Sequence, residues 1–386
     1  VIANDIMNIS GKIVSNNGPV LIVAEIGQNH QGSVPIAKEM ILKAKEIGVD
    51  CVKFQKSDLA SKFTRKALER PYDGPNSWGG TYGEHKMHLE FSIDEYKDLQ
   101  KFCSDIGILF TASAMDPVSF QQLVDLKVPF IKIGSGDADN LPMLRQAALV
   151  NMPLVVSTGM QSWVQVQLIR KILSGKATAL LHCVSAYPTP PEEAYLNLIP
   201  LYRQHLPDLV IGYSGHEQGL QITVASVLLG ARIVERHFTL DKNWKGTDHK
   251  ASLDPTEFGR LVKYIRTVEN MERTETTVQV QNICAQVLTE EELDHALKSV
   301  TVDDRKLLES EIACHSKLGK SLVFGSDIEP GHVLQAADVA VKVSEPRGLS
   351  PTLFDSVVGK IVAVRRSKDD PIQENDLVNL IAQKLL

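Results

Sequence analysis

The fold is decided by the stretch Leu209-Val-Ile-Gly-Tyr-Ser-Gly-His216 and its successor Ala231-Arg-Ile-Val-Glu-Arg-His237. Each is a short run rich in apolar and β-branched residues, and a segment with a helical pattern separates the two. Buried runs of this kind, alternating with helices, are typical of a parallel sheet. Both runs end in a histidine, so polar chemistry is expected at the C-terminal ends of two successive strands.

Six further runs of the same kind precede this pair. The first intervening helix is predicted to be capped by Ser33, with Pro35 in its first turn, and the last to open on a capping box at Asp254–Glu257. Eight strand–helix units predict an α/β protein with a closed (β/α)8 barrel, because no glycine fingerprint of an open doubly wound sheet follows the first strand. The predicted strands are Val20–Glu25, Cys51–Gln55, Ile108–Ser113, Phe130–Gly134, Leu154–Ser157, Ala179–Val184, Leu209–Ser214 and Ala231–His237.

The chain of 386 residues is longer than a barrel of about 250 residues requires. We predict a barrel domain over residues 1–271, a polar linker or insertion over 272–310, and a β-rich module over 311–386. Within the insertion, 289–299 has the pattern of one helix. The module is predicted to contain short strands at Lys320–Val323, Ile328–Gly331, Val339–Val343 and Lys360–Val364.

Composition narrows the class of partner and the compartment. A hydrophobic fraction of 43% and a net charge of −6 suit a globular protein that binds neither nucleic acid nor an anionic membrane as its main partner. No apolar run approaches the roughly 20 residues of a membrane span. The five cysteines contain no C-x-x-C pair, which favours reduced thiols and a cytoplasmic location.

The two histidines predict a metal site. His216 and His237 end neighbouring strands at the face of a barrel that carries chemistry. Two imidazoles do not fill a coordination sphere, so water and substrate oxygens are expected to complete it. That arrangement suits an exchangeable Mn²⁺, Mg²⁺ or Co²⁺ that acts as a Lewis acid.

Lysines and hydroxyls at other strand ends predict an anion site. Lys53 and Lys132 lie within apolar strands, where an unpaired ammonium would cost several kcal/mol. Both are therefore expected at the barrel mouth, facing an anion. Strand-end hydroxyls that could join them in a phosphate cradle are Ser113, Ser135, Ser157 and Ser214.

Carboxylates complete the predicted site. Glu25 closes the first strand and is a candidate general base or water-holding group. Asp137 follows the fourth strand, and Asp248, in a glycine-containing loop after the eighth, could accept hydroxyls of a sugar. Tyr187 is expected to form a wall of the pocket.

These residues lie in motifs that resemble those of the sialic acid synthase family, over most of the chain. The motifs are Ala24–Gly32, Val52–Gln55, Lys132–Ser135, Tyr213–His216, Glu235–His237 and Lys245–Leu253. The C-terminal module resembles the antifreeze-like domain of these enzymes. Arg65–Tyr72, Ser77-Trp78 and Thr81–Lys86 resemble the animal branch, which uses a 6-phosphorylated sugar.

The resemblance implies condensation of phosphoenolpyruvate with N-acetylmannosamine 6-phosphate, with mannose 6-phosphate as a further candidate acceptor. Glu25 would handle the attacking water, and Asp248 and Tyr187 would contact the sugar. The module would cover the site of a second subunit in a domain-swapped homodimer, with Arg347 reaching the N-acetyl group. Phosphoenolpyruvate would be bound by Lys53, Lys132, Ser135, Ser157 and Ser214, with Gln55 and Ser113 nearby.

Three other functions stay open at this point. They are a synthase for unphosphorylated N-acetylmannosamine, a metal-dependent aldolase for a free 2-oxo acid, and a non-catalytic carbohydrate- or ice-binding protein. Activity is expected to fall below about pH 6 through protonation of the metal-binding imidazoles. Basic residues of the long second βα loop are candidates for the acceptor phosphate, namely Lys62, Arg65, Lys66 and Arg70.

Overall fold

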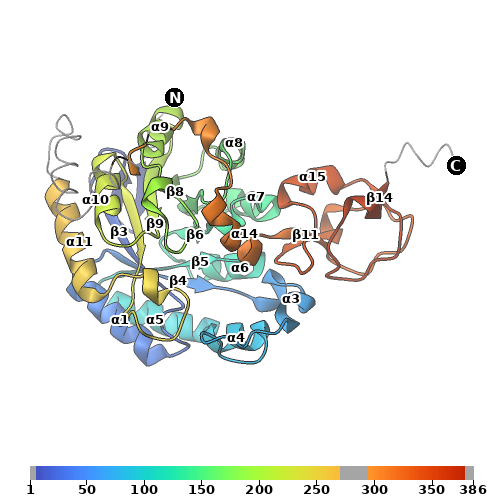
Figure 1. Cartoon of the computed structure of the whole chain (residues 1–386), viewed down its shortest axis with the longest axis horizontal. Coiled ribbons are helices and arrows are strands. Elements are labelled where there is room, and N and C mark those ends of the chain that lie inside the picture. The colour runs from blue at the N-terminus through green and yellow to red at the C-terminus, as the bar shows by residue number, and fades with distance from the viewer. Residues whose placement is uncertain (1–5, 270–293, 295, 299, 379–386) are drawn as a thin grey trace.

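The structure, a computed structural model, describes residues 6–269, 294, 296–298 and 300–378. Its larger part is a closed barrel of eight parallel strands, which follow one another around the ring in chain order (Figure 1). The predicted barrel is confirmed, with strand ends within two residues of those expected. The strands are β3 (Leu21–Gly27), β4 (Cys51–Lys56), β5 (Leu109–Ala114), β6 (Ile131–Ile133), β7 (Leu154–Ser157), β8 (Thr178–Cys183), β9 (Val210–Gly215) and β10 (Ile233–His237).

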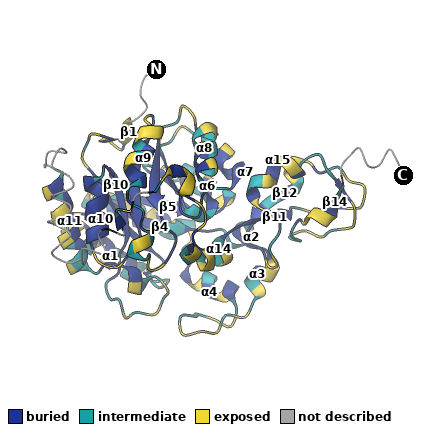
Figure 2. Cartoon of the chain, turned by 45° about the horizontal axis from the view of Figure 1, so that its top comes forward, coloured by how far each residue is buried: buried dark blue, intermediate teal, exposed yellow. Residues whose placement is uncertain are grey.

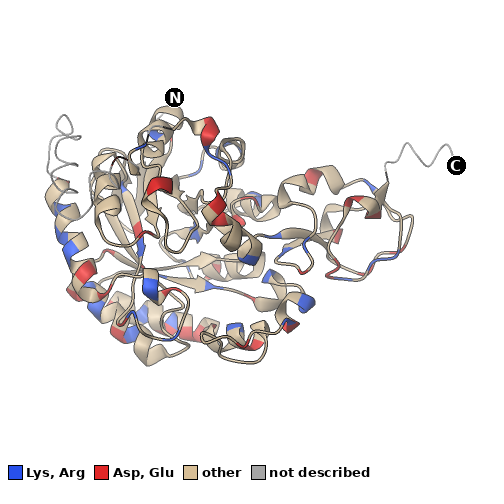
Figure 3. Ribbon diagram, viewed as in Figure 1, with Lys and Arg blue, Asp and Glu red and all other residues tan. Residues whose placement is uncertain are grey.

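Helices pack around the outside of this ring. Most of them have a buried inner face and an exposed outer face, but every residue of α10 (Gln221–Leu228) is buried, and the strands are buried almost throughout (Figure 2). Basic and acidic residues are interspersed along α1 (Val34–Glu46), α5 (Ile93–Ile106) and α11 (Pro255–Val268) (Figure 3). The helices are α1 (Val34–Glu46), α5 (Ile93–Ile106), α6 (Pro117–Asp125), α7 (Leu141–Leu149), α8 (Trp163–Ile172), α9 (Leu198–His205), α10 (Gln221–Leu228) and α11 (Pro255–Val268).

The predicted helix starts are confirmed. Oγ of Ser33 accepts the backbone N–H of Ile36 at the start of α1, and Pro35 occupies the first turn. Asp254 and Glu257 form the capping box of α11. These caps satisfy N–H groups that have no partner inside a helix, so they fix where each helix leaves its loop.

A hairpin of β1 (Ile6–Ile9) and β2 (Lys12–Ser15), which the sequence analysis did not predict, closes the N-terminal end of the barrel. Met7, Ile9 and Val14 are buried in one cluster with side chains from the starts of the barrel strands. Asn16 forms two hydrogen bonds at the start of β9. Its Nδ2 donates to Leu209 O at 2.8 Å, and its Oδ1 accepts the backbone N–H of Ile211 at 3.1 Å. The opposite, C-terminal end is left for the polar side chains.

The connection from β4 to α5 makes a long excursion through α2 (Leu59–Lys62), α3 (Arg65–Glu69) and α4 (Tyr82–Leu89). It packs against the C-terminal module through a small apolar cluster that includes Phe63, Tyr82 and Val343. Backbone hydrogen bonds join the same parts, since Thr64 N donates to Val343 O at 3.0 Å and Val343 N donates to the Lys62 carbonyl at 2.8 Å. The excursion is therefore held against the C-terminal module.

The C-terminal module contains two small antiparallel sheets and a short helix, α15 (Phe354–Val357). Three of the predicted strands are present as β11 (Ser321–Phe324), β12 (Val339–Lys342) and β13 (Ile361–Val362). The predicted strand at Ile328–Gly331 is wrong: Ile328 makes only an isolated bridge with Arg366, because Pro330 and Gly331 turn the chain there. The second sheet is completed instead by β14 (Leu377–Val378), which was not predicted.

Much of the predicted insertion at 272–310 lies outside the described residues, as does most of the helix expected at 289–299. The described end of it follows the barrel surface, where Leu196 N donates to Ala296 O and Asn197 Nδ2 donates to Val300 O, both at 3.0 Å. The chain then enters α14 (Ile312–Leu318). Figure 1 shows α14 between the barrel and the module.

Candidate active site

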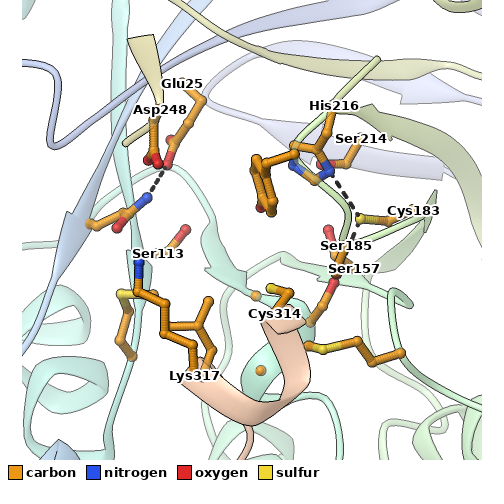
Figure 4. A pocket seen from close by; sticks show the side chains of 18 of the residues that line it. Glu25, Ser113, Ser157, Cys183, Ser185, Ser214, His216, Asp248, Cys314 and Lys317 are labelled. Atoms are coloured by element: carbon orange, nitrogen blue, oxygen red, sulfur yellow. Dashed lines mark hydrogen bonds between the residues drawn. The ribbon is translucent and has the colours of Figure 1, made fainter. Parts of the chain in front are cut away.

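A cavity of about 500 Å³ opens at the C-terminal ends of the barrel strands. Figure 4 shows side chains from several strands converging on it, with α14 across from Glu25, His216 and Asp248. All of the predicted site residues except Arg347 line this cavity, namely Glu25, Lys53, Gln55, Ser113, Lys132, Ser135, Asp137, Ser157, Tyr187, Ser214, His216, His237 and Asp248.

Glu25 and Lys53 form a buried ion pair in the cavity, with Nζ of Lys53 2.6 Å from Oε2 of Glu25. Lys53 Nζ also donates to Oγ of Ser113 at 2.7 Å, and Gln55 Nε2 donates to Oε1 of Glu25 at 2.9 Å. Burial raises the pKa of Glu25 to about 6, although Lys53 opposes the rise. A carboxyl group that can exchange a proton near neutral pH is thus held in one orientation.

Lys132 lies beside this pair and shares a carboxylate with it. Its Nζ donates to Oγ of Ser157 at 2.6 Å and lies 4.0 Å from Oε1 of Glu235. Lys53 is 3.6 Å from the same oxygen, which also accepts a 3.2 Å hydrogen bond from Ser214 Oγ. Burial would raise the pKa of Glu235, but Lys132 and Lys53 hold it below its ordinary value.

Glu235 was not among the predicted site residues, although it lines the cavity. The signal was present in the sequence, since alternate residues of a strand point to the same side. Glu235 lies two residues before His237 on β10 and therefore shares its face. We call Lys53, Lys132, Glu25 and Glu235 the floor cluster.

His216 and His237 meet as predicted, with ring centroids 5.5 Å apart. Nδ1 of His216 lies 2.8 Å from the carbonyl oxygen of Val184, which leaves Nε2 as the nitrogen with a lone pair. Nδ1 of His237 is buried without a hydrogen-bond partner, 3.9 Å from Oδ2 of Asp248. The ring of Tyr187 covers His216 at a centroid distance of 4.1 Å.

Ser135 is held by the loop that follows β7. Its Oγ accepts the backbone N–H of Gly159 at 3.0 Å, and its carbonyl accepts Nε2 of Gln161 at 3.0 Å. A Cβ on Gly159 would lie 2.2 Å from Oγ of Ser185 and 2.6 Å from that of Ser135, so only glycine fits. Cys183 Sγ lies 3.6 Å from the Ser135 hydroxyl.

The same loop is tied to the chain segment before α14 by a buried ion pair. Oε1 of Glu311 accepts N–H groups of Met160 at 2.8 Å and Ser185 at 2.9 Å, and also lies 2.9 Å from Nη2 of Arg305. Arg305 Nη2 donates in turn to the Cys183 carbonyl at 3.2 Å. This Arg305–Glu311 clamp fixes the loops after β7 and β8, and it starts the helix that forms the far wall of the cavity.

Asp137 lines the cavity, but its carboxylate already has a partner. Lys320 of the C-terminal module forms a buried ion pair with it, and Asn140 Nδ2 donates to the same oxygen at 3.1 Å. Lys320 also donates to the carbonyl of Met115 at 2.7 Å. The module is thereby anchored to its own barrel beside the cavity.

Besides Lys53, Lys132 and Lys320, three lysines line the cavity, and we call them the rim cluster: Lys62 of α2, Lys86 of α4 and Lys317 of α14. Of the four basic residues considered in the second βα loop, only Lys62 is among the lining residues. Arg65 and Lys66 have side chains that are 83% and 68% exposed. Arg70 instead lies over the ring of Tyr82, with Cζ 4.1 Å from its centroid.

Arg347 does not line the cavity of its own chain. Its guanidinium donates to the carbonyl of His315 at 2.9 Å and to that of Lys320 at 3.3 Å. A contact of Arg347 with the N-acetyl group of a sugar requires a second chain and stays a prediction.

Comparison with known proteins finds similarity along nearly the whole chain. The NeuB family matches residues 40–277, and the SAF domain matches residues 319–378. The N-acetylneuraminate-9-phosphate synthase of Drosophila melanogaster is 50% identical over 98% of this chain and 100% of its own length. The human protein of the same name is 46% identical over 97% of each chain.

The fold agrees with a solved relative. The crystal structure of the spore coat polysaccharide biosynthesis protein spsE from Bacillus subtilis superposes with a TM-score of 0.76 at 27% identity. The match covers 97% of this chain and 99% of that one, so it includes both the barrel and the module.

Proposed function

The chain belongs to the NeuB family, and from this we propose that it condenses phosphoenolpyruvate with N-acetylmannosamine 6-phosphate. The products are N-acetylneuraminate 9-phosphate and inorganic phosphate. The observation that carries the proposal is the floor cluster, in which two buried lysines and a carboxyl of pKa about 6 face the same cavity as two imidazoles. Relatives that match nearly the whole chain bear the name of this reaction.

Phosphoenolpyruvate is the substrate that suits the floor. Lys53 and Lys132 supply fixed positive charge, and hydroxyls from four strand ends surround them. Charge-assisted hydrogen bonds of this kind contribute roughly 1.5–3 kcal/mol each. Hydroxyls placed to serve the phosphate and carboxylate of this substrate are those of Ser113, Ser135, Ser157 and Ser214.

The two imidazoles fit a divalent cation. His237 has a buried nitrogen without a partner, and the contact of His216 with Val184 directs its other nitrogen to ligand binding. Among the described residues no group of three or more His, Cys, Asp or Glu side chains could hold a metal ion. A Mn²⁺, Mg²⁺ or Co²⁺ ion held here would need oxygens of water and substrate, and it would polarise the acceptor aldehyde as a Lewis acid.

The atoms balance as follows. C3 of phosphoenolpyruvate forms a bond to the aldehyde carbon of the open-chain sugar, which leaves positive charge at C2. Water adds to C2, and the bond between C2 and the phosphate oxygen then breaks. One proton of the water goes to the former aldehyde oxygen, and the other leaves with phosphate.

Within this sequence Glu25 orients the water and takes its proton, because its pKa lies near 6 and Gln55 fixes its other oxygen. Lys132 stays with the departing phosphate, where its charge stabilises the leaving group. Asp248 lies beside His237 and is placed to accept hydroxyls of the acceptor. Tyr187 covers one side of the site.

The position of bond cleavage tests the proposal. Phosphoenolpyruvate labelled with ¹⁸O in the bridging position should release phosphate that carries the label, in an amount equal to the sugar acid formed. An aldolase would accept pyruvate and release no phosphate. An inert binding protein would turn over neither substrate.

Removal of metal gives a second test. Exhaustive chelation should abolish turnover, and Mn²⁺, Mg²⁺ or Co²⁺ should restore it. His216→Ala should bind the cation more weakly in a titration without substrate, while the circular dichroism of the fold stays unchanged. Full activity after chelation would contradict the assignment of the imidazoles.

The domain-swapped homodimer and the cytoplasmic location are further proposals. The module contacts its own barrel through Lys320 and Asp137, and Arg347 is placed away from the cavity of its own chain. In a swapped dimer, Arg347→Ala should raise KM for the acceptor, and mixing it with an inactive His216→Ala chain should restore one working site. Among the described residues, no helix has the length and apolar character to cross a membrane.

A further inference from the structure

The rim cluster brings together three ammonium groups from distant parts of the chain. Lys62 is 5% exposed, and its Nζ donates to Oγ of Ser57 at 3.3 Å, contacts Sδ of Met115 at 3.1 Å and lies 5.1 Å from the centroid of the Phe63 ring. Lys86 Nζ donates to Oε1 of Gln28 at 2.8 Å. In the part of the chain that the structure describes, no carboxylate lies within ion-pair distance of Lys62, Lys86 or Lys317.

Other lysines at this end of the barrel are neutralised. Lys56 lies 2.6 Å from a carboxylate oxygen of Glu90, and Lys320 is paired with Asp137. In the described part of the chain the rim lysines therefore lack a carboxylate partner, although carboxylates lie close by. Burial lowers the pKa of Lys62 to about 8, and Lys86 adds to the effect.

Lys86, like Lys62, has a lowered pKa and no carboxylate partner among the described residues. Burial lowers its pKa to about 8, with a further contribution from the charge of Lys317. A folded protein that keeps like charges together and partly dehydrated loses stability by doing so. Such an arrangement is expected where an anionic ligand supplies the missing charge.

We infer that Lys62, Lys86 and Lys317 form the subsite for the phosphate of the acceptor sugar. The inference rests on the proposed function, because it names the part of the same cavity that recognises the phosphorylated acceptor. The floor cluster already has its own lysines and hydroxyls for phosphoenolpyruvate. A phosphate monoester on the primary hydroxyl of the acceptor is the ligand with the charge and size for the remaining lysines.

The subsite would also set specificity. An acceptor without phosphate leaves three ammonium groups in the cavity without partners, and a site built for a charged group discriminates strongly against a substrate that lacks it. One of the three lysines, Lys317, comes from outside the barrel, because it lies on α14. Closing the acceptor site would then depend on the Arg305–Glu311 clamp that starts this helix.

The test compares Lys62→Met, Lys86→Met and Lys317→Met with the matched control Lys66→Met. Lys66 lies in the same excursion, but its side chain is 68% exposed and outside the cavity. Each enzyme is assayed with N-acetylmannosamine 6-phosphate and with N-acetylmannosamine, at saturating phosphoenolpyruvate and metal.

Each rim variant should raise KM for the phosphorylated acceptor about tenfold to a hundredfold, which corresponds to about 1.4–2.8 kcal/mol. KM for phosphoenolpyruvate and kcat/KM for the unphosphorylated sugar should change less than threefold. Lys66→Met should match the wild type throughout. Replacement of Lys62 by arginine should recover part of the loss, because the charge is kept.

The failures are distinguishable. If the wild type uses both acceptors equally well, the proposed function is wrong. If the wild type prefers the phosphorylated acceptor and the rim variants keep that preference, this inference is wrong. A rise in KM for phosphoenolpyruvate in place of the acceptor would assign the lysines to the other phosphate, which also overturns it.

Discussion

The floor cluster and the rim cluster line one cavity, yet the lysines of the floor are paired with carboxylates and those of the rim, among the described residues, are not. Lys53 pairs with Glu25 at 2.6 Å, and Lys53 and Lys132 share Glu235 at 3.6 and 4.0 Å. The lysines of the rim have no carboxylate within reach in the described part of the chain. Paired lysines are held in one place before any ligand arrives, which suits chemistry that demands fixed geometry. Unpaired lysines keep their charge available, which suits recognition of an anion.

The two clusters should respond oppositely to loss of a charge. Lys53→Met leaves Glu25 and Glu235 buried with only Lys132, so we expect the free energy of unfolding at pH 8 to fall by about 3 kcal/mol. Lys62→Met removes a buried charge that has no carboxylate partner, so stability should be unchanged or higher. Urea unfolding measures both. Equal destabilisation by the two variants would break the distinction between the clusters.

Lys53→Met should also abolish turnover. The double variant Lys53→Met/Glu25→Gln serves as its control, because it removes one of the stranded carboxylates. We expect the double variant to recover part of the lost stability and none of the activity. Recovery of both would mean that the floor pair is structural only.

Glu25→Gln tests the chemistry of the floor without changing its shape. The amide keeps the size of the side chain but cannot take a proton from water. We expect kcat to fall about 10²- to 10⁴-fold, while KM for either substrate changes little. Rapid quench with single turnover would locate the loss after substrate binding. A fall confined to KM would assign Glu25 to binding.

The pH profile sharpens this assignment. Glu25 has a pKa of about 6, so the carboxylate is protonated and its function lost as pH falls through 6. Burial lowers the pKa of His237 to about 4, so this imidazole protonates well below that range. Burial would lower the pKa of His216, but Cys183 and the carbonyl of Val184 hold it above its ordinary value. The acid limb is therefore expected from both the Glu25 carboxyl and the His216 imidazole, and not from His237. The residual activity of Glu25→Gln should lose the part of this limb that belongs to the carboxyl and keep the part that belongs to His216.

The clamp links the two clusters, because it fixes loops that carry floor hydroxyls and also starts α14. Glu311→Gln keeps an oxygen for the N–H groups of Met160 and Ser185 but leaves Arg305 without its charge partner. We expect a loss of about 1.5–3 kcal/mol in unfolding free energy, and higher KM for both substrates in the folded enzyme. A change in stability without any change in KM would confine the clamp to a structural role.

Most of the barrel and much of the floor could be predicted from sequence. Apolar runs predict the buried strands, and the residues at the C-terminal ends of these strands lie at the same end of the barrel. His216, His237, Lys53 and Glu25 were found in this way. Glu235 was missed because a charged residue within a strand was read only as part of a motif, although its spacing from His237 carried the information.

Contacts between distant segments could not be predicted in the same way. Lys317 and Lys320 come from beyond residue 300, and no periodicity relates them to a barrel strand. Asp137 lines the cavity, and its contact with substrate stays a prediction, but its buried ion pair with Lys320 could not be anticipated. The N-terminal hairpin was overlooked because each strand has four residues, too few for a clear pattern. The sequence marks the hairpin mainly by the Ser10-Gly11 pair, which forms the turn with positive φ at both residues.

The smallest effect is expected from an exposed ion pair of good geometry. Arg145 of α7 contacts Asp355 of the module through two hydrogen bonds, of 2.8 and 2.5 Å, with side chains 46% and 62% exposed. Water and salt screen such a pair, so a double-mutant cycle of Arg145→Ala and Asp355→Ala should give a coupling below about 1 kcal/mol, falling with added salt. The floor pair has similar distances but is buried. If the coupling energy of the exposed pair were as large as that of the buried floor pair, burial would not explain the difference in strength between the ion pairs of this molecule.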